Sequence, residues 1–206
     1  MEVYRIARDL NKVPVGRHQF IAIITGKGPA AFFLKKSNIT LVSQLLGKEY
    51  GLVLGAHNVN PKEQKKPAKF NRLIFKPFER ADLAAAKEFF TSVVGKHALW
   101  ENYNPAQGKK IIPHKGISEA KFVRDIIDAI DLYIVNERSS NIPYPTPWFG
   151  KNSNSWVSSL LSAVQADIIK GGDDFTGADA GHDVQIDKDY FKGICSPCQI
   201  QNSAYR

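Results

Sequence analysis

The chain of 206 residues has only two cysteines and no long hydrophobic run. No segment approaches the roughly 20 apolar residues that a membrane-spanning helix requires. The first residues, Met1 to Arg5, lack the apolar core of a signal peptide. These absences predict a soluble protein without a transmembrane segment, located in the cytoplasm or secreted without a cleaved signal peptide.

Both cysteines stand near the end of the sequence, as Cys195 and Cys198. A Cys-x-x-Cys pair can be half of a zinc site, a redox pair or a disulfide. A zinc site needs two more ligands, and His182 is the only nearby candidate. Because no strand-to-helix turn precedes the pair, a thioredoxin-type role is disfavoured. We therefore expect two structural thiols and neither a metal nor another cofactor.

Two further segments lack the pattern of a ligand-binding loop. The acidic, glycine-rich stretch 171–183 has several aspartates but not the Asp-x-Asp-x-Asp-Gly spacing of a calcium-binding EF-hand. The segment Gly26 to Pro29 is too short for a phosphate-binding loop. We predict a surface loop for the first and a turn for the second.

The composition is that of an ordinary globular chain, with 43% apolar and 23% charged residues, and predicts a single domain over residues 1–206. The net charge of +8 raises the hypothesis of a nucleic-acid-binding module, although a solvated, proline-bracketed loop is the preferred interpretation of the one dense basic patch. Anionic partners such as wall polymers or lipid headgroups also fit the charge. The patch consists of Lys62, Lys65, Lys66, Lys69 and Arg72.

Hydrophobic periodicity predicts an α+β fold, with strands early in the chain and helices later. The segment 30–34 is expected to pair with 17–25 as a hairpin across the Gly26–Pro29 turn. Ser118 is a suitable first residue for the second helix. The predicted strands are 17–25, 30–34, 51–57 and 70–76, and the predicted helices are 82–94, 118–136 and 154–168.

The most informative segment starts at Asn152, after an aromatic, proline-rich approach over 144–150. Asn and Ser favour helix N-caps, and Trp156, Leu160 and Val164 then recur at helical spacing. Ser153 is therefore expected where a helix begins. Backbone N–H groups and the helix dipole favour negative charge there, which suits an attacking hydroxyl and the oxyanion it creates.

A histidine, His18, opens the apolar strand predicted over 17–25. Together with Asn152–Trp156 it resembles the circularly permuted papain-like superfamily, which includes NlpC-type cell-wall peptidases and the lecithin:retinol acyltransferase group. In those permuted members a His opens an early strand, and an Asn-Cys-x-x-aromatic motif later opens the helix of the nucleophile. The departure is Ser153, which stands where those families have Cys. The resemblance covers these two short motifs and implies an antiparallel sheet packed against a nucleophile-bearing helix.

The resemblance also implies roles for individual residues. Ser153 would be the nucleophile and His18 its base, and a hydroxyl needs a better-placed base than a thiol does. For the group that orients the imidazole we select His57, with Asn58 and His114 as alternatives. The residues expected to contact substrate are Asn152, Asn154, Trp156 and Trp148.

The implied function is a hydrolase or acyltransferase that cleaves an amide or ester bond. Its substrate would be a cell-wall peptide or lipid attacked by a bacterial secreted effector or toxin, with an immunity or chaperone protein as partner. Two alternatives remain open at this point. Asn and Ser at a helix start are also ordinary capping residues, so the domain could be a catalytically silent papain-like module that binds through the same cleft. The other alternative is the basic nucleic-acid-binding module.

Overall fold

The computed structural model describes residues 1–10, 17–59, 72–95, 103–144, 151–164, 166–167, 175 and 184–192. Several sequence-based predictions lie outside these residues: both cysteines and His182, Trp148, the four lysines of the basic patch, and the glycine-rich stretch apart from Phe175. In the described part of the chain, no helix combines the length and apolar character needed to cross a bilayer.

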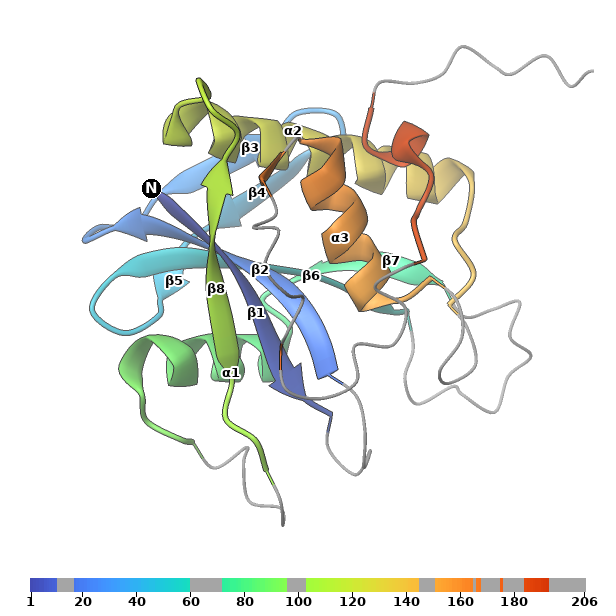
Figure 1. Ribbon diagram of the computed structural model, residues 1–206. Coiled ribbons are helices and arrows are strands. Elements are labelled where there is room, and N and C mark those ends of the chain that lie inside the picture. The colour runs from blue at the N-terminus through green and yellow to red at the C-terminus, as the bar shows by residue number, and fades with distance from the viewer. Residues whose placement is uncertain are drawn as a thin grey trace, which may run out of the picture.

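The centre of the fold is an antiparallel sheet whose strands follow the order β5-β6-β2-β1-β8-β9, with β7 also paired to β6 (Figure 1). The strand β2 lies in its interior and is buried along most of its length. The strands are β1 (Glu2–Asp9), β2 (Arg17–Gly26), β5 (Gln44–Leu45), β6 (Tyr50–Asn58), β7 (Leu73–Pro77), β8 (Gln107–Pro113) and β9 (Ala166–Asp167).

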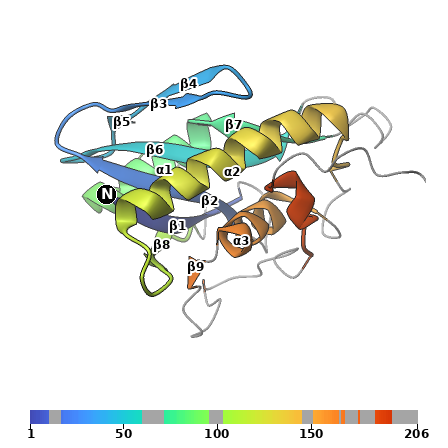
Figure 2. The same cartoon turned by 90° about the horizontal axis from the view of Figure 1, so that it is seen from above.

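Helices cover both faces of this sheet (Figures 1 and 2). On one face α1 (Arg80–Thr91) packs on the alternate residues Phe20, Ala22 and Ile24 of β2. On the other face α2 (Glu119–Ser139) and α3 (Ser153–Ala163) pack on Ile21 and Ile23 and form the larger core. Because successive strand residues point to opposite faces, β2 contributes to both cores.

The predicted α+β class is confirmed, and the predicted strand 17–25 and the start of the second helix at Ser118 closely match the structure. The hairpin prediction is wrong. The strand β3 (Ala31–Leu34) pairs with β4 (Ile39–Val42) in a separate two-stranded sheet. Both edges of β2 are already occupied by β1 and β6, so no edge is left for β3.

The structure also contains elements that periodicity did not indicate, among them the strand β1 beside β2, the strand β8 beside β1, and the short 3-10 helix η4 (Lys188–Tyr190). The remaining helices are shifted slightly, because α1 begins at Arg80 and α3 ends at Ala163. The first turns of α1 and α3 both contact the beginning of β2, through different side chains. This junction contains the predicted site residues His18 and Ser153.

Candidate functional site

The first turn of α3 is closed by a capping box. The Asn152 side chain accepts hydrogen bonds from the backbone N–H groups of Asn154 and Ser155, and the Ser155 hydroxyl accepts one from the Asn152 N–H. The backbone N–H of Ser153 has no acceptor among the described residues. The first turn of α3 therefore retains one N–H that could bind a developing oxyanion.

Asn154 fixes this helix start to β2. Its Oδ1 accepts a hydrogen bond from the Gln19 N–H at 2.9 Å, and its Nδ2 donates to the Arg17 carbonyl at 2.9 Å. The ladder between β2 and β6 ends at the pair Ile21 and Leu54. The side-chain amide thus satisfies two backbone groups of β2 that β6 no longer pairs. Asn154 as a whole is 2% exposed. Asn154, predicted to contact substrate, has this structural role.

Ser153 follows the N-cap and is buried. Its hydroxyl donates to Asn154 Oδ1 at 3.3 Å. Among the hydrogen bonds between described residues, none joins Ser153 to His18. The two residues belong to segments that Asn154 holds together, so the backbone brings them to one junction while their side chains bond to different groups.

His18 and His57 are brought together by a carboxylate that the sequence analysis did not select. Nε2 of His18 lies 3.0 Å from Oδ2 of Asp82, and Nε2 of His57 lies 2.7 Å from the same oxygen. The ring centroids of the two histidines are 4.3 Å apart. Arg8 Nε donates to the other oxygen, Oδ1, at 2.7 Å. His57 therefore shares an acceptor with His18 and does not bond to it directly.

The charges in this cluster are set by burial and by its neighbours. Burial lowers the pKa of His18 to about 4, although the Asp82 carboxylate opposes this change. Burial alone would raise the pKa of Asp82, but His18, Arg8 and the hydrogen bonds from both imidazoles hold that pKa well below its usual value. At neutral pH His18 is thus uncharged and Asp82 is ionised. An ionised carboxylate only accepts, so both Nε2 atoms donate to Asp82, and Nδ1 of the uncharged His18 keeps its lone pair.

The position of Asp82 follows from α1. Glu79 is the N-cap, and its carboxylate accepts hydrogen bonds from Ala81 and Asp82 N–H groups, so Asp82 lies in the first turn. Negative charge is favoured at this end of a helix. Gly55 of β6 leaves room for the cluster, because a Cβ there would lie 2.8 Å from Asp82 Oδ2 and 3.1 Å from His57 Nε2.

A divalent metal is the one inorganic cofactor for which this cluster offers ligands. The ligand atoms of His18, His57 and Asp82 lie within 4.8 Å of one another, and two imidazoles with one carboxylate are a common donor set. The hydrogen bonds within the cluster already satisfy these atoms without an ion, and Arg8 balances the carboxylate charge. These hydrogen bonds account for the arrangement of the three side chains.

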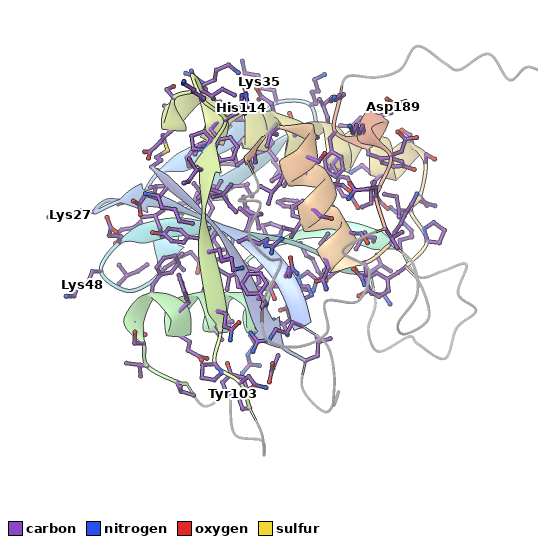
Figure 3. The ribbon with its side chains drawn as sticks, viewed as in Figure 1. Lys27, Lys35, Lys48, Tyr103, His114 and Asp189 are labelled. Atoms are coloured by element: carbon purple, nitrogen blue, oxygen red, sulfur yellow. The ribbon has the colours of Figure 1, made fainter. Side chains whose placement is uncertain are left out.

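The other predicted residues do not bond to His18, His57 or Asp82 in the described part of the chain. Trp156 is fully buried in the core, with ring contacts to Phe75 and Tyr133, and is therefore not on a surface open to substrate. Asn58 is buried at the end of β6. His114 follows β8 at the opposite end of the sheet from α1 (Figure 3). Arg72 of the basic patch forms a bidentate ion pair with Glu137.

Two residues of the cluster were missed from sequence, Asp82 and Arg8. Asp82 opens a predicted helix, where acidic residues are common for reasons of capping and dipole. Arg8 belongs to β1, which was not predicted. Comparisons with protein-family models, with curated proteins and with solved structures found no match to this chain.

Proposed function

We propose that this protein is a hydrolase or acyltransferase of permuted papain-like fold that cleaves an amide or ester bond through Ser153 and His18. The observation that carries the proposal is the attachment of the α3 start to residues 17–19 by the Asn154 amide. It brings a hydroxyl at a helix N-terminus to the strand that bears an uncharged, carboxylate-bound histidine.

In this mechanism Nδ1 of His18 accepts the Ser153 proton, because Nε2 donates to Asp82. The hydroxyl oxygen attacks the substrate carbonyl, and the Ser153 N–H stabilises the oxyanion. The amide or ester bond then breaks, the His18 imidazolium gives its proton to the leaving amine or alcohol, and water or an acceptor releases the acyl group from Ser153. Asp82 holds the tautomer and stabilises the imidazolium that forms, as the acid member of a triad does. His57 is a positioning residue that shares the Asp82 oxygen. A rotation of the Ser153 hydroxyl away from Asn154 is required before attack.

The proposed substrate is a peptide or lipid of the bacterial cell wall, and the proposed partner is an immunity or chaperone protein, as the resemblance to cell-wall peptidases suggests. A secreted effector or toxin is the corresponding biological role. The net charge of +8 is consistent with an anionic polymer as target.

A second candidate function is supported by the bonds of the two side chains. Ser153 bonds to Asn154, and His18 bonds to Asp82 on the face covered by α1. A papain-like domain that has lost its thiol and uses the junction only for binding would have this arrangement. The nucleic-acid alternative has less support, since Arg72 is paired with Glu137.

A fluorophosphonate probe, which reacts covalently with activated serines, separates these candidates. We expect labelling of the native chain at Ser153, identified by peptide mass spectrometry. Ser153→Ala should abolish it, and His18→Gln should slow it by about 100-fold or more, the usual contribution of a general base. Ser155→Ala, which removes a capping hydroxyl, is the matched control and should still be labelled.

Circular dichroism should show that all variants are folded before labelling is compared. A native chain that is folded but unlabelled would reject the serine mechanism and favour the silent binding domain. Labelling that persists in Ser153→Ala would place the nucleophile elsewhere. Cell-wall sacculi and lipid esters, analysed by mass spectrometry for released products, then distinguish the two substrate classes.

A further inference from the structure

Two polar side chains beside the candidate site are buried without hydrogen bonds to the part of the chain that the structure describes. All three guanidinium nitrogens of Arg17 and both amide atoms of Gln19 are inaccessible and have no hydrogen-bond partner among the described residues. The Arg17 side chain is 1% exposed. Burying a guanidinium or an amide without partners costs several kcal/mol, as an order of magnitude, and native proteins rarely leave it uncompensated.

Both side chains lie on one face of β2. Successive strand residues alternate, and His18 and Phe20 point to the α1 side, so Arg17 and Gln19 point to the face of Ile21 and Ile23. That face carries α3. The backbones of the same two residues bond to Asn154 in the first turn of α3, whose positive dipole end therefore adds to the Arg17 charge.

The carboxylate that is paired with Arg17 does not satisfy its guanidinium group. Asp9 Oδ1 lies 3.5 Å from Arg17 Nε, which is an ion pair without hydrogen-bond geometry. The other oxygen, Oδ2, accepts two bonds from Asn104. Both terminal nitrogens of Arg17 thus remain as donors for a further group, next to a Gln19 amide that can donate and accept.

We propose that Arg17 and Gln19 form a binding site for a small oxyanion, a carboxylate or a phosphate, beside the start of α3. A guanidinium fork matches the two oxygens of either group, and such charge-assisted pairs are among the strongest hydrogen bonds in proteins. A hydrogen phosphate would also donate its O–H to Gln19 Oε1, which a carboxylate cannot do.

This inference deepens the proposed function by assigning an anionic group to its substrate, but anion binding does not depend on acyl transfer. The test uses inorganic phosphate and acetate with the native protein, and sodium chloride at the same ionic strength as the reference. We expect phosphate, acetate or both to raise the thermal midpoint saturably, as binding to the folded state requires. Isothermal titration calorimetry should give one site per chain.

Arg17→Met is the decisive variant, because it keeps the length of the side chain and removes the charge. In chloride it should raise the midpoint above that of the native chain, since it eliminates a buried cation whose nitrogens form no hydrogen bonds with the described residues. It should also abolish the calorimetric signal. Gln19→Leu should weaken binding by roughly tenfold, the equivalent of about one hydrogen bond. Arg124→Gln, on the exposed side of α2, is the matched charge control and should bind as the native chain does.

Phosphate stabilises many proteins without a site, by exclusion from their surface. An equal midpoint shift in the native chain and in Arg17→Met would therefore overturn the proposal, as would a native chain that titrates with neither anion. A loss of stability in chloride for Arg17→Met would also overturn it, because Arg17 would then be satisfied by the protein itself. None of these outcomes changes the fluorophosphonate result, so the two proposals fail independently.

Discussion

The Nδ2 of Asn154 donates to the carbonyl of Arg17 at 2.9 Å, although 137 positions separate the two residues in the sequence. Together with the bond from the Gln19 N–H, this contact replaces two backbone bonds at the point where β6 leaves β2. It also defines where the first turn of α3 lies on the sheet. The candidate site therefore depends on the side chain of Asn154, which has a structural role.

Asn154→Ala should lower the free energy of unfolding by about 2–4 kcal/mol, because it leaves a buried N–H and a buried carbonyl of β2 without partners. Urea unfolding followed by circular dichroism measures this. Asn104→Ala, at an exposed side chain, is the control and should cost less than about 1 kcal/mol. Equal, small effects for both variants would show that water replaces the Asn154 amide.

Gly55→Ala should disturb the histidine cluster although none of the residues of the cluster is replaced. The added methyl group would lie 2.8 Å from Asp82 Oδ2, so the carboxylate or the strand must move. We expect a loss of about 1–3 kcal/mol, typical of overpacking, and shifted imidazole signals of His18 and His57 in NMR spectra. Gly28→Ala has open space around it and should change neither quantity. Unchanged imidazole signals in folded Gly55→Ala would contradict the geometry of the cluster.

Stability should fall as the pH drops below about 6.5. The pKa of His18 falls from 6.5 in the unfolded chain to about 4 in the folded one, so between these values the unfolded state binds the additional proton. Asp82, whose pKa is also lowered, adds to the loss as pH falls through and below 3.8. The His18 contribution is roughly 2–4 kcal/mol over this window.

His18→Gln should flatten the stability curve between pH 6.5 and pH 4, because glutamine has no proton to gain. Urea midpoints at half-unit pH steps, with His114→Gln as the control, provide the measurement. A His18→Gln curve that runs parallel to the native one would show that another group carries the pH dependence.

Local signals explain which parts of this fold could be predicted. The buried run of β2 and the start signal at Ser118 are encoded by neighbouring residues, and both were recognised. The same is true of the start of α3 near Ser153, although its N-cap, Asn152, was expected to contact substrate. The pairing of β3 was not recognised, because it depends on β1 and β6 filling both edges of β2. Asp82 was missed for a similar reason: only the packing of α1 on the sheet makes a first-turn aspartate the shared acceptor of His18 and His57.

Trp156 shows that a sequence motif does not determine whether a side chain is exposed. Its place in the motif suggested contact with substrate, yet helical periodicity equally predicts a core position, and the structure buries it completely. A motif gives the type of side chain at a position, while exposure is decided by the elements that pack around it.

The two native cysteines should be dispensable for folding. The double variant Cys195→Ser, Cys198→Ser should have a thermal midpoint within a few degrees of that of the native chain. The native chain should contain no bound zinc, because we expect structural thiols without a metal. Differential scanning fluorimetry and elemental analysis check both points. Stoichiometric zinc in the native chain, lost in the double variant, would contradict this prediction.

In that cysteine-free background, Ser153→Cys supplies the sharpest measurement of the local field. The new thiol would lie in the first turn of an eleven-residue helix that Asn154 attaches to the strand of the uncharged His18, and the N–H of position 153 has no acceptor among the described residues. A helix N-terminus lowers a thiol pKa below its ordinary value of about 8.5. The rate of iodoacetamide alkylation against pH should therefore show a midpoint at least one unit lower than that of Ser162→Cys, an exposed position near the end of α3.

Adding His18→Gln should raise the midpoint of the Ser153→Cys thiol. An imidazole can accept the thiol proton and form an ion pair with the thiolate, whereas glutamine cannot. If Ser153→Cys and Ser162→Cys titrate alike in folded protein, the start of α3 does not activate a nucleophile, and the serine mechanism loses its physical basis.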